Sequence, residues 1–164
     1  MIILGLDPGL GTTGFGVIQK IGSKLSLVEY GVLSTPAKTP LSTRLLSIST
    51  QLRSLFLSHT IDSVAVEELF FNTNTKTAIA VAQARGVLLL LSEEAKKPVS
   101  GYTPPQVKSG VCGYGRATKQ QVQYMVKQLL HLEKIPKPDD AADALAVAIC
   151  HAHTNPSRYA AALN

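Results

Sequence analysis

The sequence has little of what marks membrane, secreted or disulfide-stabilised proteins. No apolar run approaches the ~20 residues that cross a bilayer, which excludes a membrane-spanning helix. The first ten residues, MIILGLDPGL, lack a basic segment and reach Pro8 and Gly9 too early for a signal peptide. The two cysteines, Cys112 and Cys150, form no C-x-x-C pair and indicate no disulfide framework. We therefore expect a reducing, cytoplasmic setting.

Repeats, low-complexity stretches and linkers are also missing, so residues 1–164 are predicted to form a single domain. The composition, 45% hydrophobic and 16% charged, is typical of a folded globular protein and argues against disorder. Sixteen Lys and Arg residues against eleven Asp and Glu give a net charge of +5. This modest basic excess is compatible with a polyanionic partner and equally with an ordinary basic surface.

Apolar periodicity and turn residues predict alternating strands and helices. The predicted strands cover residues 2–7, 14–20, 25–35, 62–67 and 98–102. The predicted helices cover residues 41–58, 75–95, a short segment from Pro104, 118–131 and 139–153. Short links make the first three strands an antiparallel meander. The order predicts an α/β fold in which a mixed five-stranded sheet is flanked by helices.

Acidic residues follow two of the predicted strands. Asp7 ends the first strand before a Pro-Gly turn, and binding sites in open α/β sheets gather outside the carboxyl ends of strands. An aspartate before such a turn also bonds turn amides in many proteins. Glu67 and Glu68 end the fourth strand, where alternation places only one of them on the face of Ser63 and Ala65. Periodicity does not decide which glutamate faces a site and which faces solvent.

Three further acids, Asp139, Asp140 and Asp143, open the last helix. Acids in a first turn complement the helix dipole, which is the usual reason for one or two of them. This helix is apolar nearly all round, and Asp140 and Asp143 share the face continued by Val147. Carboxylates that point inward need a metal, another cation or a shifted pKa.

Acids at two strand ends and one helix start together predict a Mg²⁺ or Mn²⁺ site, because hard cations prefer oxygen ligands. Two such ions about 4 Å apart activate a water and stabilise the leaving oxygen of a phosphodiester. Two competing interpretations are weaker. LDPGLGTTG lacks the pattern of a P-loop and resembles the first phosphate loop of actin-like ATPases, which need two such domains. His151 and His153 could suggest zinc, but without a second cysteine cluster we interpret them as structural.

Five segments follow one another in the order and spacing of a known family. They are LGLDPGLGTTGFGVI at 4–18, VEELFF at 66–71, AQARGV at 82–87, PPQVKSGVCGYGRATKQQVQ at 104–123 and DDAADALAVAICHAH at 139–153. On these segments the chain resembles the RuvC family of bacterial Holliday-junction resolvases over nearly its whole length. The resemblance implies a ribonuclease-H-like fold, in agreement with the predicted order of elements. It also implies a homodimer that resolves four-way DNA junctions by paired symmetric nicks, leaving 5′-phosphate and 3′-hydroxyl ends.

Four acidic positions of the family fall on this sequence, and they imply that Mg²⁺, with Mn²⁺ as a substitute, is held by Asp7, Glu67, Asp140 and Asp143. The pattern V-E-x-x-F selects Glu67 over Glu68, which stands where the family often has an amide. Asp139 is an additional acid. The rival hypothesis is a noncatalytic junction-binding protein of the same fold, which would require a missing carboxylate.

The resemblance also implies DNA contacts and partners. Phe70 would stack on an unpaired base near the crossover, and the basic positions are Lys108, Arg116 and Lys119. A flexible basic loop, GYGRATK, that enters a helix is itself a favourable phosphate contact. The Ala- and Leu-rich helix 75–95 is a candidate dimer surface, although a core role would explain its composition equally well. The branch-migration proteins RuvA and RuvB are implied as partners.

Overall fold

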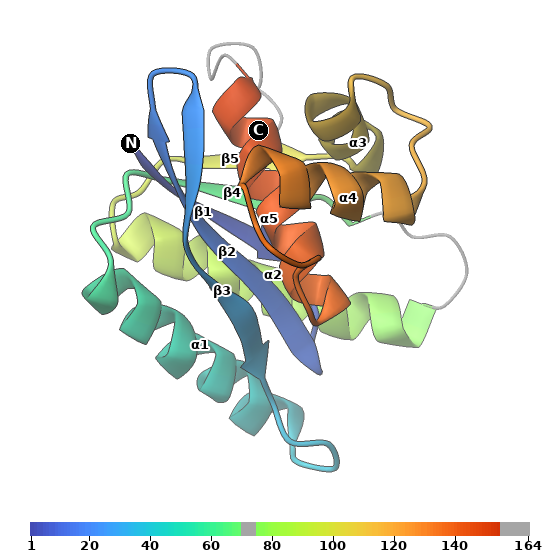
Figure 1. Ribbon diagram of the computed structural model, residues 1–164. Helices are drawn as coiled ribbons and strands as arrows, with labels where there is room; N and C mark the ends of the chain where they lie inside the picture. The colour runs from blue at the N-terminus through green and yellow to red at the C-terminus, as the bar shows by residue number, and fades with distance from the viewer. Residues whose placement is uncertain (70–74, 155–164) are drawn as a thin grey trace.

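A mixed β-sheet with helices on both faces organises the chain (Figure 1). The structure, a computed structural model, describes residues 1–69 and 75–154. Its strands are β1 (Ile2–Asp7), β2 (Thr12–Ile21), β3 (Lys24–Ser34), β4 (Ser63–Glu67) and β5 (Val99–Tyr102). The strand order is β3-β2-β1-β4-β5. The first three strands form the expected antiparallel meander, whereas β4 pairs in parallel with β1 and β5 pairs in parallel with β4.

The helices form two layers that enclose this sheet. They are α1 (Leu41–Ser58), α2 (Thr75–Glu94), α3 (Pro104–Cys112), α4 (Lys119–Leu129) and α5 (Asp139–His153). α1 and α2 pack together on one face, while α5 crosses the other face with α3 and α4 beside it (Figure 1). The predicted α/β architecture is thereby confirmed. None of the helices in residues 1–69 and 75–154 is long and apolar enough to cross a membrane.

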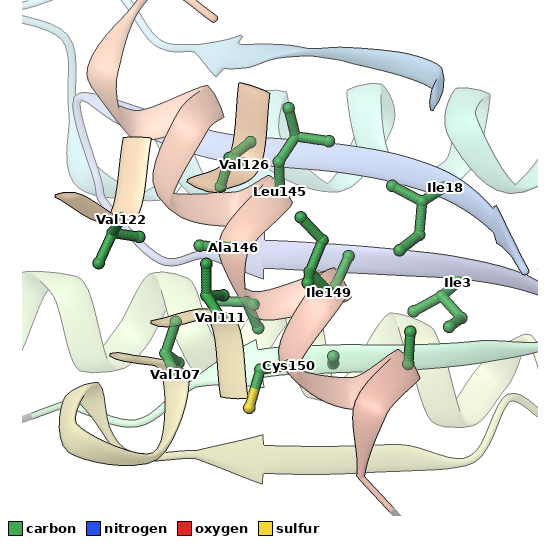
Figure 2. Packing of buried hydrophobic residues seen from close by; sticks show 14 of the residues in the cluster. Ile3, Ile18, Val107, Val111, Val122, Val126, Leu145, Ala146, Ile149 and Cys150 are labelled. Carbon is green, nitrogen blue, oxygen red and sulfur yellow. The ribbon is translucent and has the colours of Figure 1, made fainter. Parts of the chain in front are cut away.

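Side-chain alternation in the central strands divides the core into two clusters. In β1, Leu4 and Leu6 face the α1 and α2 layer, whereas Ile3 faces α5. Figure 2 shows Leu145 and Ile149 of α5 lying over the sheet on the side of Ile3. Asp7 has the same parity as Ile3, so the end of β1 presents its carboxyl on the face covered by α5.

Two glycines allow the backbone of α5 to lie directly on the sheet. A Cβ built on Gly5 of β1 would lie 2.2 Å from the carbonyl oxygen of Ala144, and one built on Gly14 of β2 would lie 1.9 Å from that of Asp140. Side chains at these positions would hold the helix away from the strands. Because Gly14 pairs with Asp7 across the sheet, this contact brings the first turn of α5 to the end of β1.

The other end of α5 is tied to the sheet by buried polar groups. The ring of His151 lies between the Tyr102 hydroxyl, 2.8 Å from Nδ1, and the Ser63 hydroxyl, 3.0 Å from Nε2. His153 contacts the carbonyl oxygen of Gly110 through Nδ1 at 2.9 Å. Both histidines therefore have structural contacts, in keeping with the sequence interpretation. Cys150 is buried with a free thiol.

Candidate functional site

Two parallel strands end side by side and present carboxyl groups on the same face. Leu6 of β1 pairs with Val66 of β4, so the next residues, Asp7 and Glu67, are neighbours at the carboxyl edge of the sheet. Both side chains are half-buried under α5. The Asp7 and Glu67 carboxyls interact as neighbours, and this interaction raises the pKa of Asp7 and acts to lower that of Glu67. The pair thus favours a state in which the two groups do not both carry a negative charge.

The first turns of α5 bring two more acids to this edge. Asp140 accepts a hydrogen bond through Oδ2 from the hydroxyl of Thr12, at 3.0 Å. Asp143, one turn further along, accepts one through Oδ2 from the ammonium group of Lys119, at 2.9 Å. The four predicted acids thus lie at the same edge of the sheet, one each from β1 and β4 and two from α5, near enough for the charges of the other three to act on Asp7.

The electrostatics of the site show how strongly these acids interact. Burial raises the pKa of Asp7 to about 8, and the negative charges of Glu67, Asp143 and Asp140 contribute to the rise. Burial also raises the pKa of Glu67, although its hydrogen bond with Asp7 and the nearby charges of Lys119 and Lys108 act in the opposite direction. The acids thus act on one another's pKa, and the two lysines offset part of this effect at Glu67.

Two neighbouring acids are directed elsewhere. Glu68 follows the end of β4 and lies over β5, where a Cβ built on Gly101 would be 2.8 Å from its Oε1. Gly101 belongs to the opposite face of the sheet from Glu67, because it pairs with Val66. Asp139 is bound by lysines, with Oδ1 2.7 Å from the ammonium group of Lys137 and Oδ2 3.5 Å from that of Lys119. Glu68 is thus directed to the opposite face from Glu67, and Asp139, unlike Asp140, is paired with two lysines.

A pocket of about 270 Å³ opens next to the acids. Its polar lining is Glu67, Asp143, Lys108 and Lys119, and its apolar lining is Pro104, Val107, Val122 and Ala146. The two lysines predicted as DNA contacts thus come together with two of the predicted acids. An anionic group that entered this pocket would meet both ammonium groups beside the carboxylates.

The remaining predicted contacts lie outside this pocket. Arg116 is exposed on the segment between α3 and α4. Phe70 lies outside the described residues. Thr12, whose hydroxyl reaches Asp140, is a site residue that the sequence analysis missed, because the predicted second strand began at residue 14 whereas β2 begins at Thr12.

The four carboxylates are suitable ligands for a hard divalent cation, although their present positions do not form a complete metal site. Carboxylate oxygens are the ligands that Mg²⁺ and Mn²⁺ prefer, and the negative charges of Glu67, Asp143 and Asp140 act on Asp7. Within residues 1–69 and 75–154, no three His, Cys, Asp or Glu side chains are grouped so that they could hold one metal ion as they stand. A cation would therefore have to offset the burial that favours the neutral form of Asp7 and compete with Lys119 for Asp143.

The family comparison and the most similar relatives identify the same family. The family described as Crossover junction endodeoxyribonuclease RuvC matches residues 3–151. The chain is 56% identical to the Crossover junction endodeoxyribonuclease RuvC of Clostridioides difficile over 155 residues, which is 94% of this chain and 92% of the relative. It is 55% identical to the corresponding protein of Desulfitobacterium hafniense over 94% of this chain and 93% of that relative.

Solved structures agree with the sequence comparison. A structure described as T. thermophilus RuvC in complex with Holliday junction substrate aligns with a TM-score of 0.88 and 36% identity, over 93% of each chain. The yeast mitochondrial Holliday junction resolvase Ydc2 aligns with a TM-score of 0.68 and 17% identity, over 92% of this chain and 77% of that one. At that identity the second alignment is evidence for the shared fold alone.

Proposed function

The chain belongs to the RuvC family of crossover junction endodeoxyribonucleases and is a Holliday junction resolvase of recombination and repair; on that premise, we propose that its active site is the acidic cluster under α5. In this proposal Asp7, Glu67, Asp140 and Asp143 are the catalytic residues. The observation that supports it is that four carboxyls from β1, β4 and α5 lie at one edge of the sheet, where burial and the charges of the other three raise the pKa of Asp7 to about 8.

We propose Mg²⁺ as the cofactor of these residues, with Mn²⁺ as a substitute. When bound, the metal supplies a water of lowered pKa and polarises the scissile phosphate. The chain's own contribution is to hold four oxygen donors at one edge of the sheet and to keep Asp7 and Glu67 half-buried, where charge interactions are less screened than at the surface. Hydrolysis leaves a 5′-phosphate and a 3′-hydroxyl.

Basic residues around the site are proposed to bind junction DNA. Lys108 and Lys119 line the pocket that contains Glu67 and Asp143, so a phosphate of the backbone can contact a lysine while it approaches the carboxylates. Lys119 already pairs with Asp143, and DNA phosphate would compete for this ammonium group. Arg116 extends the basic surface along the segment that leads into α4. Phe70 is proposed to stack on an unpaired base at the crossover.

A four-way junction has approximate two-fold symmetry, so a C2 homodimer presents two sites to opposing strands. We propose that residues 1–164 form one nuclease domain and that α2 supplies the dimer surface. Ile79 and Leu90 on α2 are 61% and 59% exposed, although both are apolar. Gly86 lies between them on the same face and leaves open space where a Cβ would be. The branch-migration proteins RuvA and RuvB are proposed partners of the resulting complex.

The test is cleavage of a synthetic four-way junction by the wild type and by Asp7→Asn. The variant keeps the size of the side chain and removes one charge, so it should bind the junction and fail to nick it in Mg²⁺. Asp139→Asn is the matched control, because it removes a neighbouring carboxylate that lysines already occupy, and it should still cleave. Full cleavage by Asp7→Asn would contradict the assignment. Junction binding without nicking by the wild type, in Mg²⁺ or Mn²⁺, would instead support a noncatalytic binding protein.

A further inference from the structure

We propose that the hydroxyl of Thr12 is a positioning group for Asp140, and that it decides which carboxylate of the Asp139-Asp140 pair serves the metal. The Thr12 hydroxyl donates to Asp140 Oδ2 at 3.0 Å, across 128 positions of sequence. This inference rests on the proposed function, because it assigns a role toward the same cation. Thr12 is a positioning residue and not a catalytic one, since it acts through Asp140.

The backbone around Thr12 is fixed by the turn between β1 and β2. The hydroxyl of the next residue, Thr13, donates to the carbonyl oxygen of Gly9 at 2.6 Å. A Cβ built on Gly9 would lie 2.1 Å from the carbonyl oxygen of Thr12, so the two ends of the turn are in close contact. Thr12 is also paired with Ser34 of β3. A donor on such a restrained backbone can hold a carboxylate in one orientation.

The start of α5 explains why Asp140 needs an external partner. The N-cap of this helix is Pro138, which supplies no side-chain hydrogen bond to the first turn. Carboxylates in a first turn are attracted to the free N–H groups of their own helix. Because Thr12 and Gly14 lie on the same face of β2, and Gly14 contacts the backbone of Asp140, the hydroxyl is well placed to draw the carboxylate toward the edge of the sheet.

The partners of the two adjacent aspartates differ in charge. Asp139 uses both of its oxygens on lysines, Lys137 and Lys119. Asp140 forms no salt bridge among the described residues, and its hydrogen bond comes from a neutral hydroxyl. A lysine ammonium compensates the charge of its carboxylate, so a metal must compete with two lysines at Asp139 and with one, Lys119, at Asp143. The hydroxyl of Thr12 orients Asp140 and leaves its charge in place. Oδ1 of Asp140 then remains available as a ligand.

The experiment compares Thr12→Val, which keeps the branched shape without the hydroxyl, with Thr12→Ser, which keeps the hydroxyl. The probe is Mg²⁺ alone, titrated without DNA and followed by calorimetry and by the rise in Tm. We expect Thr12→Val to weaken Mg²⁺ binding about 10-fold, the lower end for lost outer-shell partners, and Thr12→Ser to stay within about twofold of the wild type. The Mg²⁺ concentration for half-maximal junction cleavage should rise in Thr12→Val by the same factor, while junction binding in EDTA stays unchanged.

Two outcomes would refute the role of Thr12, and a third, different outcome would contradict the proposed function. Equal Mg²⁺ affinity in Thr12→Val and the wild type would refute the role of Thr12. Weaker junction binding in EDTA would also refute it, because the hydroxyl would then act on DNA. A wild type that binds no Mg²⁺ and cuts no junction would contradict the proposed function itself, whatever the variants do.

Discussion

The contact between Gly14 and the first turn of α5 gives the sharpest prediction. In Gly14→Ala, the new Cβ would lie 1.9 Å from the carbonyl oxygen of Asp140 and 2.4 Å from its carbonyl carbon. Ordinary contacts to carbon begin near 3.4 Å, so the strand and the helix must separate by about 1.5 Å. That movement carries Asp140 and Asp143 away from Asp7 and Glu67. A misplacement of about 1 Å at a reacting centre lowers rates by about 100-fold.

The assay is the single-turnover rate of junction cleavage at saturating Mg²⁺, measured beside thermal unfolding. Overpacking of this kind costs about 1–3 kcal/mol, which for a chain of this length lowers the Tm by about 3–10 °C. Gly14→Ala should therefore remain folded at 25 °C while its cleavage rate falls by about two orders of magnitude. Gly11→Ala is the matched control from the same turn, since its Cβ would meet only the end of the Arg44 side chain at 3.6 Å. Wild-type cleavage by Gly14→Ala would refute the claim that this contact sets the spacing of the acids.

Four further outcomes are expected. In EDTA, burial raises the pKa of Asp7 to about 8 from its ordinary 3.8, so the stability that Asp7 contributes should be lost as pH rises from about 4 to about 8; the Tm should fall over this range, and fall less in Asp7→Asn, as scanning calorimetry can show. Burial lowers the pKa of His151, so the stability that this residue contributes should be lost as pH falls below 6.5, and His151→Phe should unfold with a weaker acid dependence. Lys119→Ala should weaken junction binding and reduce the slope of log affinity against log salt by about 1, whereas an unchanged slope would exclude a phosphate contact. Leu90→Glu should shift the protein from dimer to monomer in light scattering if α2 is the dimer surface, and a dimer of unchanged stability would contradict that assignment.

Local patterns were sufficient to predict the order of the elements. The meander, the alternation of later strands with helices, and the range 139–153 of the last helix are all confirmed. These features depend on short-range periodicity and on turn residues, which a single sequence contains. The start of β2 was predicted two residues late, because Thr12 and Thr13 lie beside the turn and have no apolar alternation to mark them.

The choice between neighbouring acids could not be made from periodicity. Glu67 and Glu68 are adjacent, and the structure separates them because β4 ends at Glu67 while Glu68 lies beside Gly101 of a different strand. The assignment of Asp140 and not Asp139 likewise depends on partners far away in sequence, above all on Thr12 and Lys119. Long-range contacts of this kind have no local signal. The resemblance to a family selected Glu67 and Asp140, and this choice stays a prediction, which the different contacts of the neighbouring acids support.

The helix that carries two of the acids is also the centre of one core cluster. Eleven of the fifteen residues of α5 are buried, and Leu145 and Ile149 pack on the sheet (Figure 2). Genetic screens for loss of recombination should consequently recover substitutions along the whole helix, since a defect in folding and a defect in chemistry give the same phenotype there. Only variants whose soluble yield and Tm match the wild type identify catalytic positions on α5. On β1 and β4, where each acid is the last residue of its strand, the two kinds of defect separate more readily.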